Sequence, residues 1–264
     1  MIISIFINEM PEKIQPNILV TNDDGIASQN LFALAEALSP LGRVFVVAPD
    51  TEKSGVSHAF THREGLSCRP VLGNDFAVYA VSGTPADCVK FAVSELLKET
   101  PIDVVFSGVN AGENAGISSI YSGTVAGARE ATLWGIPAIS LSLVSPSEFM
   151  LSKIVSFAKE IVQNKWYLNM SPHTFWNVNF PDASPSTFGG VRATTMGLGM
   201  FSDDYEHRDG LWFLDGCKPW SNALEGSDDE ALFQSFAALT PLSLNSTDRL
   251  ELNRVQALLA SAAQ

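Results

Sequence analysis

Asp23 and Asp24 are adjacent carboxylates in the segment Asn22-Asp23-Asp24-Gly25. This segment directly follows the β-rich run 17–21 and comes before a helical pattern. Neighbouring carboxylates repel each other unless a cation lies between or beside them. A hard divalent ion such as Mg²⁺, Mn²⁺ or Ca²⁺ takes oxygen ligands of this kind. Asn-Asp and Asp-Gly are also common turn dipeptides. The segment alone therefore favours a metal site and a plain β-turn about equally.

Two further polar loops follow apolar, β-rich runs. Ser54-Gly55 comes after the run 43–48, which Pro49-Asp50 closes, and Asn110 lies in the segment 107–112, after the run 103–106. Either loop alone is weak evidence, because Ser, Gly and Asn are ordinary loop residues. The carboxyl ends of parallel strands lie at one edge of a sheet, where ligands bind. Three polar loops at that edge favour the metal site over the turn.

A small-residue segment at 121–128, Tyr-Ser-Gly-Thr-Val-Ala-Gly-Ala, has the features of an anion-binding helix start. Free N–H groups at a helix N-terminus, beside the hydroxyls of Ser122 and Thr124, bind a phosphate without basic side chains. The alternative is that Thr124 is a plain N-cap and that residues 126–128 permit close helix packing. The segment is not a Walker A loop, and no G-x-G-x-x-G follows the first strand. A dinucleotide enzyme is therefore disfavoured.

Three other titratable residues are weaker candidates. His58 follows Ser54 in the same loop, where it could contact a phosphate or a general-base water. Asp228 and Asp229 are predicted to cap a helix that begins there, with a substrate-side role as the alternative. The remaining histidines are predicted to be surface or core residues.

These candidate residues require a sheet that brings loops together. Short apolar runs alternate with amphipathic, helix-forming stretches, which indicates a parallel sheet covered on both faces. The predicted fold is α/β, with a Rossmann-like three-layer core. The predicted strands are 17–21, 43–48, 103–106 and 137–143; the predicted helices are 29–38, one beginning at Thr84-Pro85, 124–134 and 148–165; residues 66–81 form an antiparallel excursion.

Three regions are predicted along the chain. Residues 1–16 form an N-terminal extension, and residues 17–171 form the catalytic core. Residues 172–264 are predicted to form a smaller β-rich excursion and a C-terminal helix over 249–262, together an oligomerisation region. The change in texture after residue 171, where Pro, Gly and Asp interrupt short aromatic strands, is the basis for this boundary.

The composition excludes several classes of protein. With 46% hydrophobic residues the chain of 264 residues is too apolar to be disordered. Sixteen Lys and Arg against 29 Asp and Glu give a net charge of −13, which repels an extended nucleic acid. A single phosphate could still bind locally, through a cation or backbone N–H groups.

The cysteines and apolar runs bear on location. Cys68, Cys88 and Cys217 are scattered and form no C-x-x-C pair, which fits a reducing compartment. The apolar start at residues 1–7 has no basic residues before it, so a signal peptide is not predicted. No apolar run reaches the length of a membrane span. The sequence therefore predicts a cytoplasmic protein with no membrane partner.

Five of these segments, in order and spacing, resemble the SurE family, the stationary-phase survival nucleotidases. The resemblance is strong over residues 17–143 and weaker beyond, where Asp228 and Thr240-Pro241-Leu242 resemble the family's later Asp and Thr-Pro-Leu. The first sixteen residues and the region 200–235 depart from the family pattern. The matching segments are 20–26, 47–50 with Ser54-Gly55, 83–89, 107–112 and 121–126.

The resemblance implies a metal-dependent phosphatase that acts on nucleoside 5′- and 3′-monophosphates, with some activity on short polyphosphate. It implies one divalent ion, Mg²⁺ or Mn²⁺, and assembly into a homodimer or homotetramer. The metal-binding roles fall on Asp23, Asp24, Ser54 and Asn110. Phosphate binding falls on Ser122, Gly123 and Thr124, with Asn110 beside them, and the catalytic carboxylates are Asp23 and Asp24.

Two alternatives remain open. A haloacid-dehalogenase-like phosphatase, which forms an aspartyl phosphate, also carries acids at a strand end, but spaced Asp-x-Asp rather than adjacent. A non-catalytic nucleotide-binding module would use the Asp23-Asp24 pair only as a turn.

Overall fold

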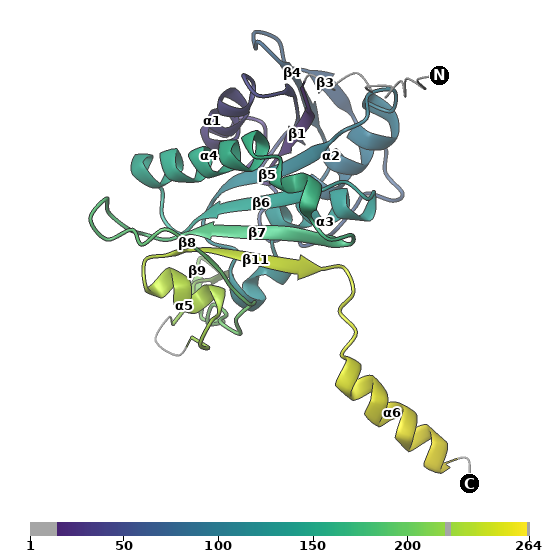
Figure 1. Cartoon of the computed structure of the whole chain (residues 1–264), viewed down its shortest axis with the longest axis vertical. Helices are drawn as coiled ribbons and strands as arrows, with labels where there is room; N and C mark the ends of the chain where they lie inside the picture. Colours follow the sequence, from purple (N-terminus) through teal and green to yellow (C-terminus); the bar gives the residue numbers. More distant parts are fainter. Residues whose placement is uncertain (1–14, 220–222, 263–264) are drawn as a thin grey trace, which may run out of the picture.

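The computed structural model describes residues 15–219 and 223–262 and is built around one nine-stranded sheet (Figure 1). The predicted N-terminal extension lies almost wholly outside these residues. The strand order is β3-β4-β2-β1-β5-β6-β7-β11-β8. The strands are β1 (Asn17–Thr21), β2 (Arg43–Pro49), β3 (Cys68–Pro70), β4 (Ala77–Val81), β5 (Val104–Ala111), β6 (Ala138–Leu143), β7 (Thr174–Phe180), β8 (Val191–Ala193) and β11 (Ala237–Ser243).

The chain reverses its direction across the sheet beside β1. From β1 it proceeds outward through β2 and β4, then returns to pair β5 with the other side of β1, and continues through β6 to β7. All of these pairings are parallel. The carboxyl ends of β1 and β5 therefore flank the topological switch point, where open α/β sheets bind ligands.

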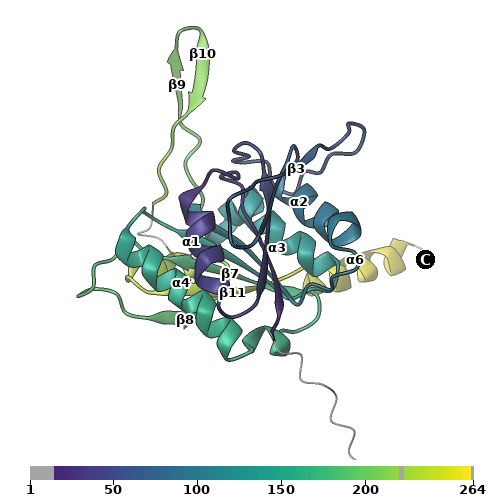
Figure 2. The same cartoon turned by 90° about the horizontal axis from the view of Figure 1, so that it is seen from above.

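Helices cover both faces of the sheet and confirm the predicted α/β fold (Figure 2). Side chains alternate across β1, so Ile18 and Val20 pack with the α1 and α4 layer, whereas Leu19 packs with the α2 and α3 layer. The helices are α1 (Gln29–Leu38), α2 (Pro85–Phe91), α3 (Gly123–Leu133), α4 (Glu148–Gln163), α5 (Asp228–Phe233) and α6 (Arg249–Ala262); η1 (Ala92–Leu96), η2 (Gly116–Ile120) and η3 (Trp166–Asn169) are short turns of helix.

Two helix starts differ in an instructive way. α2 begins as predicted: Thr84 is the N-cap, Pro85 occupies the first turn, and Asp87 completes a capping box. In α3 the N-cap is Ser122, whose side chain accepts a hydrogen bond from the Val125 N–H, so the alternative interpretation of Thr124 as a plain N-cap is wrong. Ser and Thr are both good N-caps.

Strand β5 is longer than the sequence indicates. Residues 107–111, predicted as a loop, pair with β6 through Asn110↔Ser142 and Ala111↔Leu143, after a register shift that follows Ser107. Polar and small residues made this stretch look like a loop, but β6 supplies its backbone partners.

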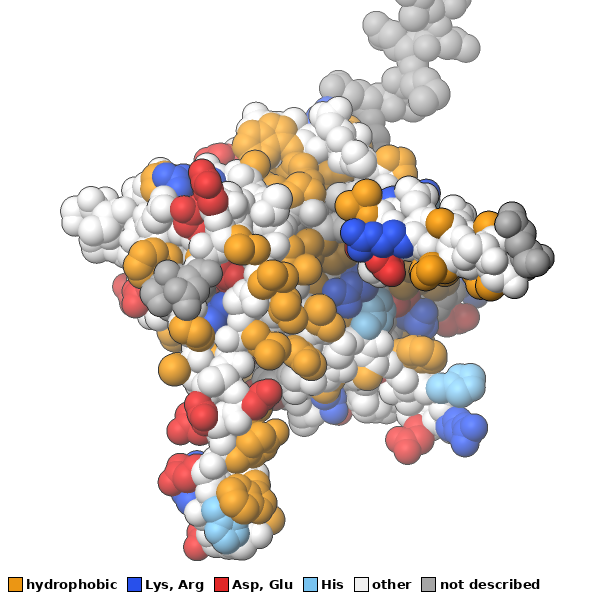
Figure 3. Space-filling model, turned by 90° about the horizontal axis from the view of Figure 1, so that it is seen from below, with side chains coloured by type: hydrophobic (Ala, Val, Ile, Leu, Met, Phe, Trp, Pro, Cys, Tyr) orange, Lys and Arg blue, Asp and Glu red, His pale blue; other side chains and the backbone are white. Residues whose placement is uncertain are grey.

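The segment after residue 171 contributes to the same sheet. β7 is parallel to β6, and β11 is antiparallel to β7, so the sheet continues across the predicted region boundary. The part that leaves the core is the hairpin β9 (Tyr205–Arg208) and β10 (Leu211–Leu214), followed later by α6. Both stand clear of the body and carry exposed apolar side chains (Figures 1, 2 and 3).

Candidate active site

The predicted metal ligands lie at the carboxyl edge of the sheet, around the switch point. Asp23 and Asp24 follow β1 directly, and Asn110 lies near the end of β5. The Lys53 N–H donates to the Asp23 carbonyl oxygen at 2.7 Å, which brings the loop of Ser54 to the pair. The Asp24 carboxylate accepts a hydrogen bond from the Ala111 backbone, which brings the end of β5 there as well. These backbone contacts bring the two loops that carry Ser54 and Asn110 toward the acid pair.

Asp23 is fixed by the first turn of α3. Its side chain is 5% exposed, and one carboxylate oxygen accepts the Thr124 N–H at 2.9 Å while the other accepts the Thr124 hydroxyl. A Cβ at Gly123 would lie 2.9 Å from Asp23 Oδ2, so only glycine fits there. Burial raises the pKa of Asp23, although the hydrogen bonds from Thr124 oppose that shift. Asp23 is therefore a positioned carboxylate with little freedom to move.

Asp24 is less confined. It is half-buried and lines an open hollow of about 420 Å³ with Ala111 and the residues that start α1. Burial, and then the charges of Asp23 and Glu52, raise the pKa of Asp24 to about 6, against a lowering by the Ala111 N–H. Burial is the largest cause of the shift, and the two neighbouring acids add to it.

Glu52 is a site residue that the sequence reasoning missed. Its charge raises the pKa of both Asp23 and Asp24, and its carboxylate accepts the Ser54 hydroxyl at 2.6 Å. Both Glu52 and Ser54 are exposed. The available signal was its position in the loop between Asp50 and Ser54, which was itself predicted to reach the site.

Asn110 presents an amide near the same edge. Its Nδ2 donates to the Gly112 carbonyl at 2.8 Å, which leaves the amide oxygen as the atom suited to a cation. Gly108 precedes it with a φ of +143°, and a Cβ there would lie 2.3 Å from the Leu141 carbonyl oxygen. The close approach of β5 to β6 that places Asn110 therefore depends on glycine.

Buried polar atoms collect beneath the acid pair. Thr21 Oγ1, Asn22 Oδ1 and Ser107 Oγ have no hydrogen-bond partner among the described residues. Gly127 brings α3 close to them, since a Cβ there would lie 2.6 Å from Ser107 Oγ. Gly127 therefore permits close helix packing, which the alternative interpretation of this segment predicted.

The donor set suits a hard divalent ion. Across residues 15–219 and 223–262, no group of three or more His, Cys, Asp or Glu side chains is arranged to hold a metal. The predicted set differs from such a group, because it combines two carboxylates with a hydroxyl and an amide oxygen. All of these donors are oxygen atoms, which Mg²⁺ and Mn²⁺ prefer. Either ion would also offset the negative charge that contributes to the raised pKa values of Asp23 and Asp24.

The start of α3 is partly committed to the protein itself. The Thr124 N–H donates to Asp23 and the Val125 N–H donates to Ser122 Oγ. Thr124 therefore holds a carboxylate in this structure, where the sequence assigned it to phosphate. Ser122 Oγ accepts one hydrogen bond and keeps its own proton to donate.

His58 has a partner other than the predicted phosphate or water. Its Nε2 lies 2.8 Å from a carboxylate oxygen of Glu130, whose other oxygen accepts from Lys90 at 2.7 Å and from the Trp134 indole at 2.9 Å. Burial raises the pKa of Glu130, but these three partners lower it by more than burial raises it, and the resulting pKa is about 2. The cluster ties the loop after β2 to α3.

Asp228 lies in the first turn of α5, but the N-cap of that helix is Ser227. The buried Asp228 carboxylate accepts the N–H groups of Gly116 and Gly197, at 2.9 and 2.7 Å. It therefore joins the loop after β5 to the segment that leads into the β9–β10 hairpin.

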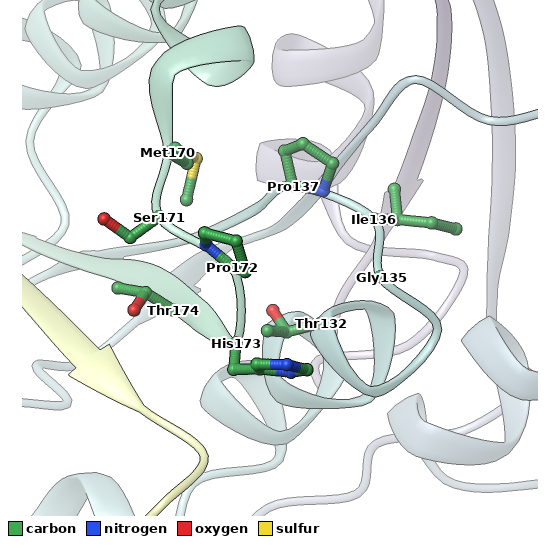
Figure 4. A pocket seen from close by; sticks show the side chains of 9 residues that line it. All are labelled: Thr132, Gly135, Ile136, Pro137, Met170, Ser171, Pro172, His173 and Thr174. Carbon is green, nitrogen blue, oxygen red and sulfur yellow. The ribbon is translucent and has the colours of Figure 1, made fainter.

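A second pocket lies away from these residues. Its lining comes from residues 132–137, before β6, and residues 170–174, before β7 (Figure 4). The amino ends of these strands form the sheet edge opposite the acid pair, so this pocket is not part of the candidate site.

Comparison with known proteins identifies the family. The family described as Survival protein SurE matches residues 18–203. The chain belongs to the SurE family. It is 38% identical over 255 residues to a protein named 5′-nucleotidase SurE from Geobacter sulfurreducens, covering 94% of this chain and 95% of that relative.

Other SurE relatives agree. A 5′-nucleotidase SurE from Desulfatibacillum aliphaticivorans is 39% identical over 248 residues, covering 91% of this chain and 97% of the relative. The crystal structure of the SurE protein from Aquifex aeolicus superposes with a TM-score of 0.79 at 33% identity, covering 92% of this chain and 99% of that one. Both confirm the resemblance drawn from the sequence segments.

No helix within the described part of this SurE-family chain is long and apolar enough to cross a membrane.

Proposed function

We propose that this chain is a divalent-metal-dependent phosphomonoesterase that hydrolyses nucleoside 5′- and 3′-monophosphates to nucleoside and phosphate. The observation that carries the proposal is the adjacent Asp23-Asp24 pair at the switch point, one acid fixed by Thr124 and the other facing an open hollow. The relatives named 5′-nucleotidase SurE support the same activity.

The metal site of the proposal uses Asp23, Asp24, Ser54 and Asn110, with one Mg²⁺ or Mn²⁺. When bound, such an ion supplies Lewis-acid activation of the phosphoryl group and lowers the pKa of a bound water. Ser54 donates its hydroxyl proton to Glu52, which leaves the lone pairs of the Ser54 oxygen available for a ligand role.

The chain's own residues position the substrate. The Ser122 hydroxyl, which accepts from Val125, is available to donate to a phosphate oxygen, and the Gly123 N–H lies beside it. Thr124 acts through Asp23, which it holds in one orientation. Backbone N–H groups at this helix start support the charge that develops on the phosphoryl oxygens.

One carboxylate of the pair then either accepts a proton from the attacking water or attacks the phosphorus directly. Both oxygens of Asp23 already accept hydrogen bonds, whereas Asp24 is half-buried at an open hollow. Asp24 is therefore the better placed of the two for either role. Direct attack would give the aspartyl phosphate of the haloacid-dehalogenase-like alternative.

Assembly and location complete the proposal. The exposed apolar residues of the β9–β10 hairpin and α6 support a homodimer or homotetramer formed through the region 172–264. Cys68, Cys88 and Cys217 are all free thiols, which supports a reducing, cytoplasmic location. Sedimentation of the purified chain and fractionation of cells test these two points.

The test of the activity is phosphate release from AMP and GMP by the purified chain, with Mg²⁺, with Mn²⁺ and after EDTA. We expect release that depends on the ion and returns when the ion is restored. No release with any divalent ion would instead favour the non-catalytic nucleotide-binding module. Trapping a phosphorylated Asp24 would favour the aspartyl-phosphate route, whereas ¹⁸O from water entering phosphate without an intermediate would exclude it.

A further inference from the structure

A third hollow, of about 450 Å³, opens beside the start of α3. It lies between the loop that follows β5 and the segment that leads into the β9–β10 hairpin. Its volume is that of a small-molecule site. It is lined by Ser118, Tyr121, Met200, Phe201, Asp203, Tyr205 and Leu214.

This hollow is a neighbour of the proposed phosphate site. Tyr121 immediately precedes Ser122, the N-cap of α3, and Thr124 contacts Asp23. Consecutive Cα atoms are about 3.8 Å apart, so Tyr121 lies within about 11 Å of Thr124. The loop after β2 holds this segment, because the Ser57 N–H donates to the Tyr121 carbonyl oxygen at 2.9 Å. A ligand whose phosphate lies at Ser122 can therefore extend into the hollow.

The lining has the chemistry that recognises a nucleobase. Tyr121, Phe201 and Tyr205 expose 57%, 39% and 59% of their surfaces around a mostly apolar hollow. Aromatic rings of this kind stack on the flat face of a purine or pyrimidine. Asp203 adds a carboxylate that can accept hydrogen bonds from an exocyclic amino group or a sugar hydroxyl.

The wall contributed by the hairpin segment is anchored to the core. Asp229 forms a buried ion pair with Lys218 at 2.7 Å and accepts the Gly199 N–H at 2.8 Å. Lys218 also donates to the Ala115 carbonyl at 2.8 Å. A Cβ at Gly199 would lie 2.5 Å from Asp229 Oδ2, so this close approach requires glycine. The residues that precede Met200 and Phe201 are thus fixed against the loop that carries Ser118 and Tyr121.

We propose that this hollow binds the nucleobase of the substrate, with the base stacked on Phe201 and Tyr121, and that it makes the enzyme prefer nucleotides to sugar phosphates. The inference rests on the proposed nucleotidase function. The base is held by ring contacts, so purine and pyrimidine nucleotides are both accepted, and the larger purine ring gains more from stacking.

The test compares AMP with ribose 5-phosphate, which has the sugar and phosphate but no base. The variant is Phe201→Ala; the matched control is Trp166→Ala, since Trp166 is 36% exposed in η3 and does not line the hollow. A base–aromatic stack contributes about 1–3 kcal/mol, so Phe201→Ala should lower kcat/KM for AMP by about fivefold to 150-fold, chiefly through KM. Phe201→Tyr, which keeps a ring, should restore most of the loss.

For ribose 5-phosphate we expect less than a twofold change in every variant. If the wild type hydrolyses AMP but not ribose 5-phosphate, that difference itself supports base recognition. Comparison of Phe201→Ala with Trp166→Ala, with AMP as substrate, then tests whether the base binds in this hollow. Equal effects of these two variants on AMP, or an equal loss on both substrates, would overturn the inference while leaving the nucleotidase intact. A wild type that releases no phosphate from AMP contradicts the proposed function, and the inference with it.

Discussion

The carboxylate of Asp23 accepts two hydrogen bonds from one residue, Thr124, which is 101 positions away in the sequence. One bond comes from the backbone N–H and the other from the hydroxyl. The acid at the end of β1 is therefore held by the same helix start that is proposed to bind phosphate. The proposed metal ligand and the proposed phosphate-binding helix start are thus joined directly, which would keep a reacting phosphoryl group in register with the carboxylates.

Removal of the Thr124 hydroxyl should reduce activity. Thr124→Val keeps the shape and the N–H bond but deletes one hydrogen bond to a carboxylate, which is worth about 1.5–3 kcal/mol. If that energy orients Asp23 for turnover, kcat should fall about tenfold or more. Thr124→Ser, which keeps the hydroxyl, is the matched control and should stay within about threefold of wild type. Steady-state kinetics with AMP decide, and equal activity of the Val and Ser variants would contradict this role for the hydroxyl.

Gly123→Ala should disturb the acid pair although alanine favours helix. An added Cβ would lie 2.9 Å from Asp23 Oδ2, closer than real Cβ contacts. We expect kcat to fall about tenfold or more, while the helix preference of Ala, about 1 kcal/mol over Gly, limits the loss of stability. Gly65→Ala is the control, because nothing lies within 4 Å of a Cβ there. Unchanged turnover in Gly123→Ala would show that this close approach is not required.

Glu130 should make folding stability depend on pH. Its pKa in the folded chain is about 2, below its ordinary value of 4.5, so its stabilisation is fully present above about pH 4.5 and is lost as pH falls toward 2. A shift of this size corresponds to about 3 kcal/mol. Glu130→Gln should therefore lower the free energy of unfolding in urea by about that amount at pH 7 and by progressively less below pH 4.5.

The matched control for this prediction is Glu160→Gln, an exposed acid on α4. It should change the free energy of unfolding by less than about 0.5 kcal/mol at either pH. A pH-independent difference between wild type and Glu130→Gln would mean that Glu130 acts through packing rather than through its charge.

Metal binding should stabilise the folded chain. An ion that binds the native state alone, at a hundred times its dissociation constant, adds about 2.7 kcal/mol. Mn²⁺ should therefore raise the Tm of the wild type by several degrees and should have little effect on Asp24→Asn. Asp50→Asn, an exposed acid at the end of β2, should retain the full shift. Scanning fluorimetry across a Mn²⁺ titration measures this without reference to activity, and equal shifts in all three proteins would place the ion elsewhere.

Local sequence patterns could predict those parts of the candidate site that lie where strands end. Because parallel strands end at one edge, the polar residues after three apolar runs indicated a shared site, and the fold brings Asp23, Asp24 and the loops of Ser54 and Asn110 there. The sequence could not predict that Ser122 rather than Thr124 is the N-cap, since both residue types cap well. Thr124 was predicted to bind phosphate but contacts Asp23, because α3 packs over the end of β1. Local sequence patterns do not predict that packing.

Long-range pairing explains the other differences. The sequence predicted that β7 and β11 belong to a smaller β-rich region, because the breaks around them are local signals. The strands with which they pair are distant in the sequence and give no local signal. Residues 107–111 looked like a loop until β6 supplied backbone partners. Glu52 escaped notice because a single acid in a polar loop has no distinctive spacing, although its charge acts on the Asp pair.

The most direct test of the account is phosphate release from AMP by Asp24→Asn, measured beside wild type over a range of Mn²⁺ concentrations. The substitution preserves size but removes the charge that the proposed metal site and chemistry both require. We predict Mn²⁺-dependent release by the wild type and a loss of at least about a thousandfold in the variant, with unchanged circular dichroism. Release by Asp24→Asn at the wild-type rate would contradict the central claim that this acid pair is the catalytic metal site.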